Sequence, residues 1–172
     1  MAVHSPTGLV YLACSTLESR KVWAPYFNIF TKPSTEDYVA LYNPANPTTE
    51  AFTRLRLEGF TDPRGLNTHG MDLVPSSKNP KEAFIYLVNH RPYLDGNSTE
   101  LGANSVIEVF RTVVGSDTLV HVTTFEDPEV VYTPNSVSGS PDGDWAFFTN
   151  DFASKTNDVS TFRRDEPIVY KQ

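Results

Sequence analysis

The residues of this sequence that are best suited to chemistry are two histidines, His69 and His90. A neutral imidazole can take a proton from water near neutral pH, so a histidine pair suits general acid–base catalysis. Residues 83–88 are typical of a buried strand, and this strand ends in Asn89 and His90. A folded β-unit that joins the ends of segment 67–90 would place the histidines together. The reaction that this pair favours is hydrolysis of an ester or lactone, and the alternative for each histidine is a structural role in the core.

Asparagine and aspartate residues near the ends of other predicted strands indicate a metal ion. Asn135 lies on the approach to one strand, and Asn150 and Asp151 close the apolar run 145–148. Calcium takes about six to eight oxygen ligands, including amide oxygens, whereas zinc prefers nitrogen and sulfur. Asn135 is therefore the first candidate for a calcium ligand, and calcium would stabilise charge on a substrate carbonyl while a histidine activates water. Asn150 and Asp151 fit a strand-end turn equally well.

Short apolar runs separated by turn residues predict strands. The 13 prolines and 9 glycines supply frequent turns. Residues 105–125 show the clearest period-two alternation and predict a hairpin that turns near Gly115. Residues 38–57 predict another hairpin, and 15–36 predicts a long loop that packs through its aromatic residues. The predicted strands are 9–14, 38–42, 52–57, 83–88, 105–111, 119–125 and 145–148, and 167–172 begins a further one.

Polar strand ends recur at a regular distance along the chain. Cys14 and His90 are 76 positions apart, and His90 and Asp151 are 61 apart. A period of this size with about four short strands is typical of β-propeller blades, whose inner strands end at a central channel. We therefore predict an all-β fold in which residues 1–172 form a single partial β-propeller domain of about two to three blades, each a four-stranded antiparallel sheet. Because propellers close with about four to eight blades, missing blades or a complementary chain would complete the ring.

Composition and charge argue against several kinds of partner. Fourteen Lys and Arg against 21 Asp and Glu give a net charge of −7 without a basic cluster, so we expect no nucleic-acid partner. No stretch approaches the ~20 apolar residues of a membrane span. The single cysteine, Cys14, lies in an apolar run and is expected to be a buried thiol rather than a nucleophile. His4 and His121 are weaker candidates for chemistry than His69 and His90.

Five short motifs follow one another along the chain. They are HGM at 69–71, YLVNH at 86–90, SVIEVF at 105–110, PNSV at 134–137 and FTND at 148–151. In this order and spacing they resemble the paraoxonase/arylesterase family, most closely its fungal members, over nearly the whole chain. The resemblance implies a six-bladed β-propeller with two calcium ions in its channel, one catalytic and one structural. It also implies hydrolysis of lactones, aryl esters and some organophosphates.

The resemblance implies a role for individual residues. His69 matches the family's base that acts on water, and His90 matches the partner of that base. Asn135 matches a ligand of the catalytic calcium, and the backbone carbonyl of Met71 matches a contact to the structural calcium. Ser136 stands where the family usually has an Asp that binds the structural calcium, so an uncharged hydroxyl replaces a carboxylate. The substrate would be a small ester or lactone, and members of the family are often secreted or membrane-associated.

Other calcium ligands of the family have no counterpart in this sequence. The family's Glu-Asp pair would fall at or just before Met1, and its further Asn and Asp-Asn ligands belong to blades beyond Gln172. The resemblance thus describes a member truncated at both ends, which we expect to be inactive alone, because one neutral amide plus waters holds calcium weakly. The alternative, from a different class, is a non-catalytic propeller-type module for binding or assembly, whose polar strand ends line a water-filled channel.

Overall fold

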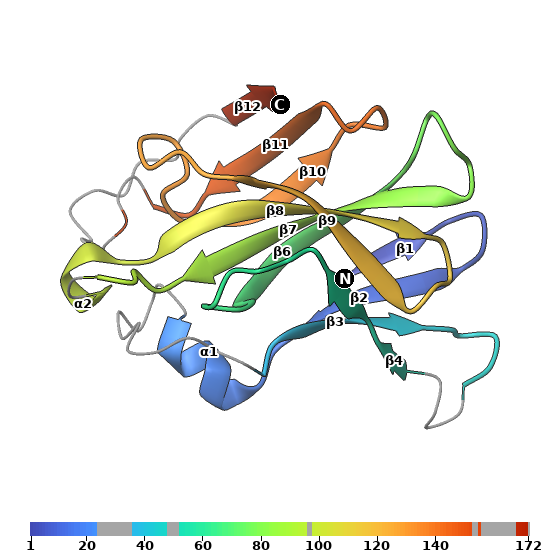
Figure 1. Cartoon of the computed structure of the whole chain (residues 1–172), viewed down its shortest axis with the longest axis horizontal. Coiled ribbons are helices and arrows are strands. Elements are labelled where there is room, and N and C mark those ends of the chain that lie inside the picture. Colours follow the sequence, from blue (N-terminus) through green and yellow to red (C-terminus); the bar gives the residue numbers. More distant parts are fainter. Residues whose placement is uncertain (24–35, 48–51, 96–97, 153–154, 156–167, 172) are drawn as a thin grey trace.

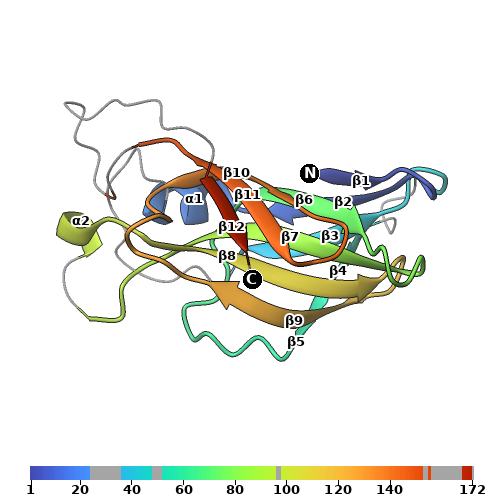
Figure 2. The ribbon, with the colours of Figure 1, turned by 90° about the horizontal axis from the view of Figure 1, so that it is seen from above.

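The computed structural model describes residues 1–23, 36–47, 52–95, 98–152, 155 and 168–171. These residues are mostly β-strand and form three sheets that stack as layers (Figure 1, Figure 2). The all-β class predicted from the sequence is therefore confirmed. None of the three described sheets closes on itself, so the fold as described is a stack of open sheets.

Sheets A and B share a plan of four consecutive strands, each antiparallel to the next. Sheet A contains β1 (Ala2–His4), β2 (Leu9–Cys14), β3 (Tyr38–Tyr42) and β4 (Phe52–Arg54). Sheet B contains β6 (Thr68–Pro75), β7 (Glu82–Arg91), β8 (Asn104–Val113) and β9 (Thr118–Phe125), and β5 (Arg56–Glu58) joins β9 in parallel. Sheet C contains β10 (Pro134–Gly139), β11 (Trp145–Asn150) and β12 (Ile168–Lys171).

The described residues include two short helices beside the sheets, α1 (Leu17–Trp23) and α2 (Ser98–Leu101). Within the described ranges, neither helix has the length and apolar character that a membrane crossing requires. Both helices lie at the same end of the sheets (Figure 1).

Strand β7 is buried on both faces because sheet B is the middle layer. The side chains of Ile85 and Leu87 belong to a core shared with sheet A, whereas those of Tyr86 and Val88 belong to a core shared with sheet C. Burying an aliphatic side chain stabilises a fold by about 1.5–3 kcal/mol. Because β7 buries side chains in both cores, it holds the three sheets together. The uninterrupted apolar run at 83–88 thus serves two cores.

Most of the predicted strands are confirmed, but two boundaries in sheets A and B were predicted wrongly. Run 52–57 is not one strand, because it divides at the buried Leu55 into β4, which pairs with β3, and β5, which pairs with β9. Strand β7 does not end before Asn89 but continues to Arg91, because β8 begins at Asn104 and pairs with it over its full length. His90 is consequently held inside a sheet.

Helix α1 lies where the sequence predicted a loop. Thr16 precedes it, and the Thr16 Oγ1 accepts a hydrogen bond from the backbone N–H of Ser19 at 3.0 Å, as an N-cap residue does. Glu18 in the first turn and Arg20 in the last turn have the charges that favour the helix dipole. The remainder of the predicted loop, 24–35, lies outside the described residues.

Sheet C is fastened to sheet B by Asp72 and by a close approach at Gly139. Asp72 Oδ2 accepts hydrogen bonds from the Ser138 hydroxyl at 2.9 Å and from the Gly139 N–H at 3.1 Å. A Cβ atom at Gly139 would lie 1.9 Å from the Tyr86 ring. Strand β10 can therefore approach β7 this closely only because residue 139 has no side chain.

We expect Gly139→Ala to lower the free energy of unfolding by about 1–3 kcal/mol, because the added methyl group overpacks the interface with Tyr86. Urea unfolding of the variant and the parent chain would measure the loss. Gly8→Ala is the matched comparison, since Gly8 has open space around it and a φ of 72°, so this variant reports only the backbone effect. A Gly139→Ala variant as stable as the parent chain would contradict the packing explanation.

Candidate functional site

The structure brings His69 and His90 into direct contact. His69 lies at the start of β6 and His90 near the end of β7, and their Nδ1 and Nε2 atoms are 3.2 Å apart. The β6–β7 register shifts between Thr68 and Met71, which places a β-bulge at His69. Bulges redirect side chains and are common next to active sites. The two ends of segment 67–90 therefore meet, as predicted.

A serine extends the pair into a chain of three side chains. Ser105 on β8 pairs in register with His90, and its hydroxyl oxygen lies 2.9 Å from His90 Nδ1. His90 is completely buried, whereas His69 is only half-buried. Contact with water or substrate is therefore open to His69, and His90 with Ser105 supports it from inside the protein.

Both imidazoles are poised to be neutral. Burial lowers the pKa of His90 to about 3, and the neighbouring His69 adds to this lowering. Burial also lowers the pKa of His69, followed by the positive charge of Arg20; the charge of Asp151 and a hydrogen bond to the Pro134 carbonyl act in the opposite direction. A neutral imidazole has one ring nitrogen free to accept a proton, as a general base requires.

Two sets of tautomers fit the contacts of the pair, and the bond between His69 and Pro134 distinguishes them. If the hydrogen bond to Pro134 is donated by Nε2 of His69, then Nδ1 of His69 accepts from Nε2–H of His90. Nδ1 of His90 then accepts from the Ser105 hydroxyl. The chain therefore has a direction, and reversing that direction would move the accepting nitrogen of His69 from Nδ1 to Nε2.

Asn135 lies next to the histidine pair because two bulges meet. The β10–β11 register shifts between Pro134 and Ser136, which places a second bulge at Asn135. A Cβ atom at Gly70 would lie 2.1 Å from the Asn135 carbonyl oxygen, so β6 and β10 touch at this glycine. The half-buried Asn135 thus follows directly on Pro134, whose carbonyl bonds His69.

The remaining residues proposed for metal binding are placed differently. Met71 is half-buried and pairs with Leu87 within sheet B, and Ser136 is exposed and pairs with Thr149 within sheet C. The described part of the chain contains no group of three His, Cys, Asp or Glu side chains arranged to hold a metal. One amide oxygen with a hydroxyl and a carbonyl falls short of the about six to eight oxygens that calcium takes, so these residues do not make a calcium site by themselves.

Asn150 has a structural role at the end of β11, as the strand-end interpretation predicts. Its Oδ1 accepts hydrogen bonds from the backbone N–H groups of Tyr132 and Thr133, both at 3.1 Å. Its Nδ2 donates to the Val130 carbonyl at 2.9 Å. Asn150 therefore closes a turn, whereas the adjacent Asp151 acts on His69 through its charge.

Sequence reasoning missed the residues that fix the approach to His69. The Asn89 Oδ1 accepts from the backbone N–H of Asn67 at 2.8 Å, and its Nδ2 donates to the buried Glu108 at 3.0 Å. The buried Asp37 accepts from the backbone N–H of Thr68 at 2.8 Å. Asn89 directly precedes His90 and is a polar residue in an apolar strand, and this pattern could have indicated that its side chain makes buried hydrogen bonds. Asp37 and Ser105 gave no local signal.

Compared with models of known protein families and with curated protein sequences, the chain matches none.

Proposed function

We propose that the chain carries the catalytic histidine pair of a calcium-dependent hydrolase of esters or lactones, of the paraoxonase/arylesterase type, within a partial β-propeller. The observation that supports this proposal is the chain Ser105–His90–His69, in which a completely buried histidine contacts a half-buried one at 3.2 Å. A buried imidazole that is kept neutral and aimed at a second imidazole is more than core packing requires, since an apolar side chain would fill the same space without desolvating polar atoms.

In the proposed reaction His69 is the general base. The catalytic form is the other set of tautomers, in which Nδ1–H of His69 donates to Nε2 of His90, and Nδ1–H of His90 donates to the Ser105 oxygen. In this form Nε2 of His69 carries no proton and does not donate to the Pro134 carbonyl, so it can take a proton from a water molecule. The resulting hydroxide attacks the ester carbonyl carbon, the C–O bond to the alcohol breaks, and the alkoxide recovers the proton from His69.

Calcium enters the proposal through Asn135, which lies beside the base and offers an amide oxygen. The described residues fall short of a calcium shell, so further oxygen ligands would have to come from other polypeptide, such as additional propeller blades. The proposal therefore includes the expectation that the chain alone turns over little or no ester.

The test is hydrolysis of phenyl acetate and of a γ-lactone, in excess calcium and in excess chelator, by the chain alone and by a longer form that carries further blades at both ends. We expect calcium-dependent turnover in the longer form. His69→Gln should lower its kcat by at least about 10²-fold, because general base catalysis contributes about 10²–10⁴-fold. His4→Gln is the control and should retain the parent rate, because His4 lies in β1 of sheet A and bonds Thr7 in the turn that follows.

Failure of the longer form to show calcium-dependent turnover, together with equal rates for His69→Gln and the parent, would reject the enzyme proposal. The non-catalytic binding or assembly module would then be the better interpretation of the same polar strand ends.

A further inference from the structure

A carboxylate is buried in sheet B at a position that the proposed reaction does not use. Glu108 on β8 is completely buried, and it pairs in register with Leu87, which belongs to the core between sheets A and B. Phe110, two residues further along the same face, is also completely buried. Taking a carboxylate out of water is costly unless its oxygens are bonded, and an apolar side chain would fill this space without that cost. The partners of Glu108 therefore indicate what the carboxylate does.

Three side chains bond Glu108, and both of its carboxylate oxygens accept. Oε1 accepts from Nδ2 of Asn89 at 3.0 Å. Oε2 accepts from the Thr124 hydroxyl at 2.6 Å, and Nε2 of His121 lies 3.1 Å from the same oxygen. Thr124 and His121 belong to β9, whereas Asn89 belongs to β7. Glu108 is thus held from β9 and presents its other oxygen to β7.

Glu108 determines which way the side-chain amide of Asn89 points. Nδ2 of Asn89 faces two acceptors, Glu108 Oε1 and the Gly65 carbonyl at 3.3 Å. Oδ1 of Asn89 faces one donor, the backbone N–H of Asn67, at 2.8 Å. A reversed amide would place oxygen against oxygen on the first side and N–H against N–H on the second. The carboxylate therefore keeps the accepting oxygen of Asn89 directed at Asn67.

Asn67 is an anchor that directly precedes the bulge at His69. Its N–H is held by the Asn89 side chain, and its carbonyl accepts from the backbone N–H of His90 at 3.0 Å. The β6–β7 register shifts between Thr68 and Met71, so His69 lies where the regular ladder is interrupted. The direction of the His69 side chain consequently depends on the residues that are held on either side of the bulge.

We propose that Glu108 is a positioning residue for His69: through the Asn89 amide it fixes Asn67, and so keeps the ring of His69 against that of His90. The proposal rests on the proposed function, in which His69 is the general base. The contacts that support it lie within sheet B and its approach segment, so they can be tested in the chain alone.

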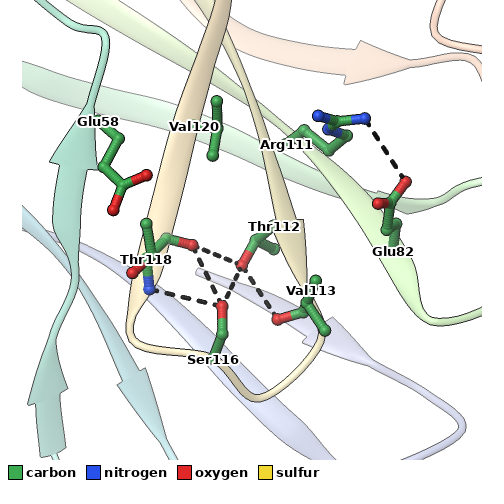
Figure 3. A pocket seen from close by; sticks show the side chains of 8 residues that line it. All are labelled: Glu58, Glu82, Arg111, Thr112, Val113, Ser116, Thr118 and Val120. Atoms are coloured by element: carbon green, nitrogen blue, oxygen red, sulfur yellow. Dashed lines mark hydrogen bonds and ion pairs between the residues drawn. The ribbon is translucent and has the colours of Figure 1, made fainter.

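Two substitutions at Glu108 separate its hydrogen bonds from its size. Glu108→Leu removes both accepting oxygens and keeps a side chain of similar size, whereas Glu108→Gln keeps one oxygen that can accept from Asn89. Glu82→Leu is the matched control on the neighbouring β7. Glu82 lies 3.9 Å from Arg111 at a groove of about 320 Å³ beside the β8–β9 turn, at the other end of β8 from Ser105 (Figure 3).

Two measurements on the chain alone report the position of His69. Hydrogen exchange would compare the backbone amide of Asn67 with the amides of β7, which report general loss of stability. The ring nitrogen chemical shifts would report the hydrogen bond between His69 and His90. We expect Glu108→Leu to lower the protection of the Asn67 amide at least about tenfold relative to β7, and to shift the ring nitrogens of His69. Glu108→Gln and Glu82→Leu should keep both parent signals.

Ester hydrolysis by the longer form with further blades gives a third readout. Glu108→Leu should lower kcat at least about tenfold with little change in KM, because a displaced base costs rate rather than binding. Glu108→Gln should restore most of the parent rate. Turnover that Glu108→Leu leaves at the parent rate would overturn the positioning role alone. A longer form without turnover would reject the hydrolase proposal, and the two measurements on the chain alone would still decide whether Glu108 positions His69.

Unchanged protection of the Asn67 amide in Glu108→Leu would overturn the proposal. Equal losses in Glu108→Leu and Glu108→Gln would also overturn it, since the glutamine keeps the acceptor for Asn89. If Glu108→Leu does not fold, the parent chain and Glu108→Gln provide the test. An Asn67 amide protected as well as the β7 amides in both proteins supports the proposal, and an Asn67 amide that exchanges like an exposed one overturns it.

Discussion

Between pH 7 and pH 4 the fold is expected to lose about 3 kcal/mol of stability through His90 alone. Burial lowers the pKa of His90 from 6.5 to about 3, so the folded state resists protonation while the unfolded state accepts it. The unfolded state binds more protons between these two values. The contribution of His90 is therefore fully present above pH 6.5 and is lost as the pH falls towards 3.

Urea unfolding at several pH values from 7 to 4 would measure this loss as a slope. Measuring above pH 4 separates it from Asp62, because the ion pairs of that carboxylate hold its pKa at about 2 and its contribution is lost only at lower pH. His90→Gln keeps a neutral donor and acceptor but cannot titrate, so its slope should be smaller by the His90 share. Gly8→Ala, which changes no ionisable side chain, is the control and should keep the parent slope.

The carbon chemical shifts of the His90 ring in the parent chain give a second, independent measurement if the variant does not fold. The ring should remain neutral in the folded protein at pH 5. Protonation of folded His90 near pH 6.5, or equal slopes for His90→Gln and the parent, would contradict the proposed burial effect and would weaken the case for a neutral histidine pair.

Local sequence patterns were enough to predict most of the strands and the pairing of neighbouring strands in hairpins, but not the pairing of segments that are distant in the sequence. The alternation in 105–125 predicted the β8–β9 hairpin, because the turn residues and the apolar positions that form a hairpin are close to one another in the sequence. The division of run 52–57 could not be predicted in this way, because Leu55 is buried in the core between sheets A and B, and β5 pairs with β9, which is distant in the sequence. Helix α1 could have been found from Thr16 and the charges around it, which are local signals.

The candidate site was predictable only in part. The contact between His69 and His90 follows from the hairpin that joins them, whose strands are adjacent in the chain. Ser105 enters the site through the β7–β8 register, which depends on the whole sheet. The role of Gly70, which allows β10 to approach β6, depends on contact with a strand from another sheet and could not be predicted from the sequence around it. Contacts between sheets, unlike contacts within a hairpin, leave no regular spacing in the sequence.

The residue after the site histidine, Arg91, is held by the most buried ion-pair network among the described residues. Its side chain is 4% exposed, and it donates to Asp62 at 2.8 Å, to Asn104 at 2.6 Å and to Glu126 at 2.9 Å. Asp62 also pairs with Arg64 at 2.7 Å. The Asp62 carboxylate is therefore shared by two guanidinium groups at the end of β7, and Glu126 is a second partner of Arg91.

We expect Asp62→Asn to destabilise the fold by about 3–5 kcal/mol, because it removes the carboxylate shared by Arg64 and Arg91 at a site with little access to water and leaves Arg91 with the more exposed Glu126. The amide keeps the size of the carboxylate, so the loss measured by urea unfolding reports charge rather than packing. Asp117→Asn, which breaks an exposed pair with Arg56 whose side chains are 65% and 56% exposed, is the control and should change little. Similar small changes in both variants would show that water reaches Arg91 and that this network does not fix the end of β7. A large loss confined to Asp62→Asn would instead make the network part of what holds His90 in place.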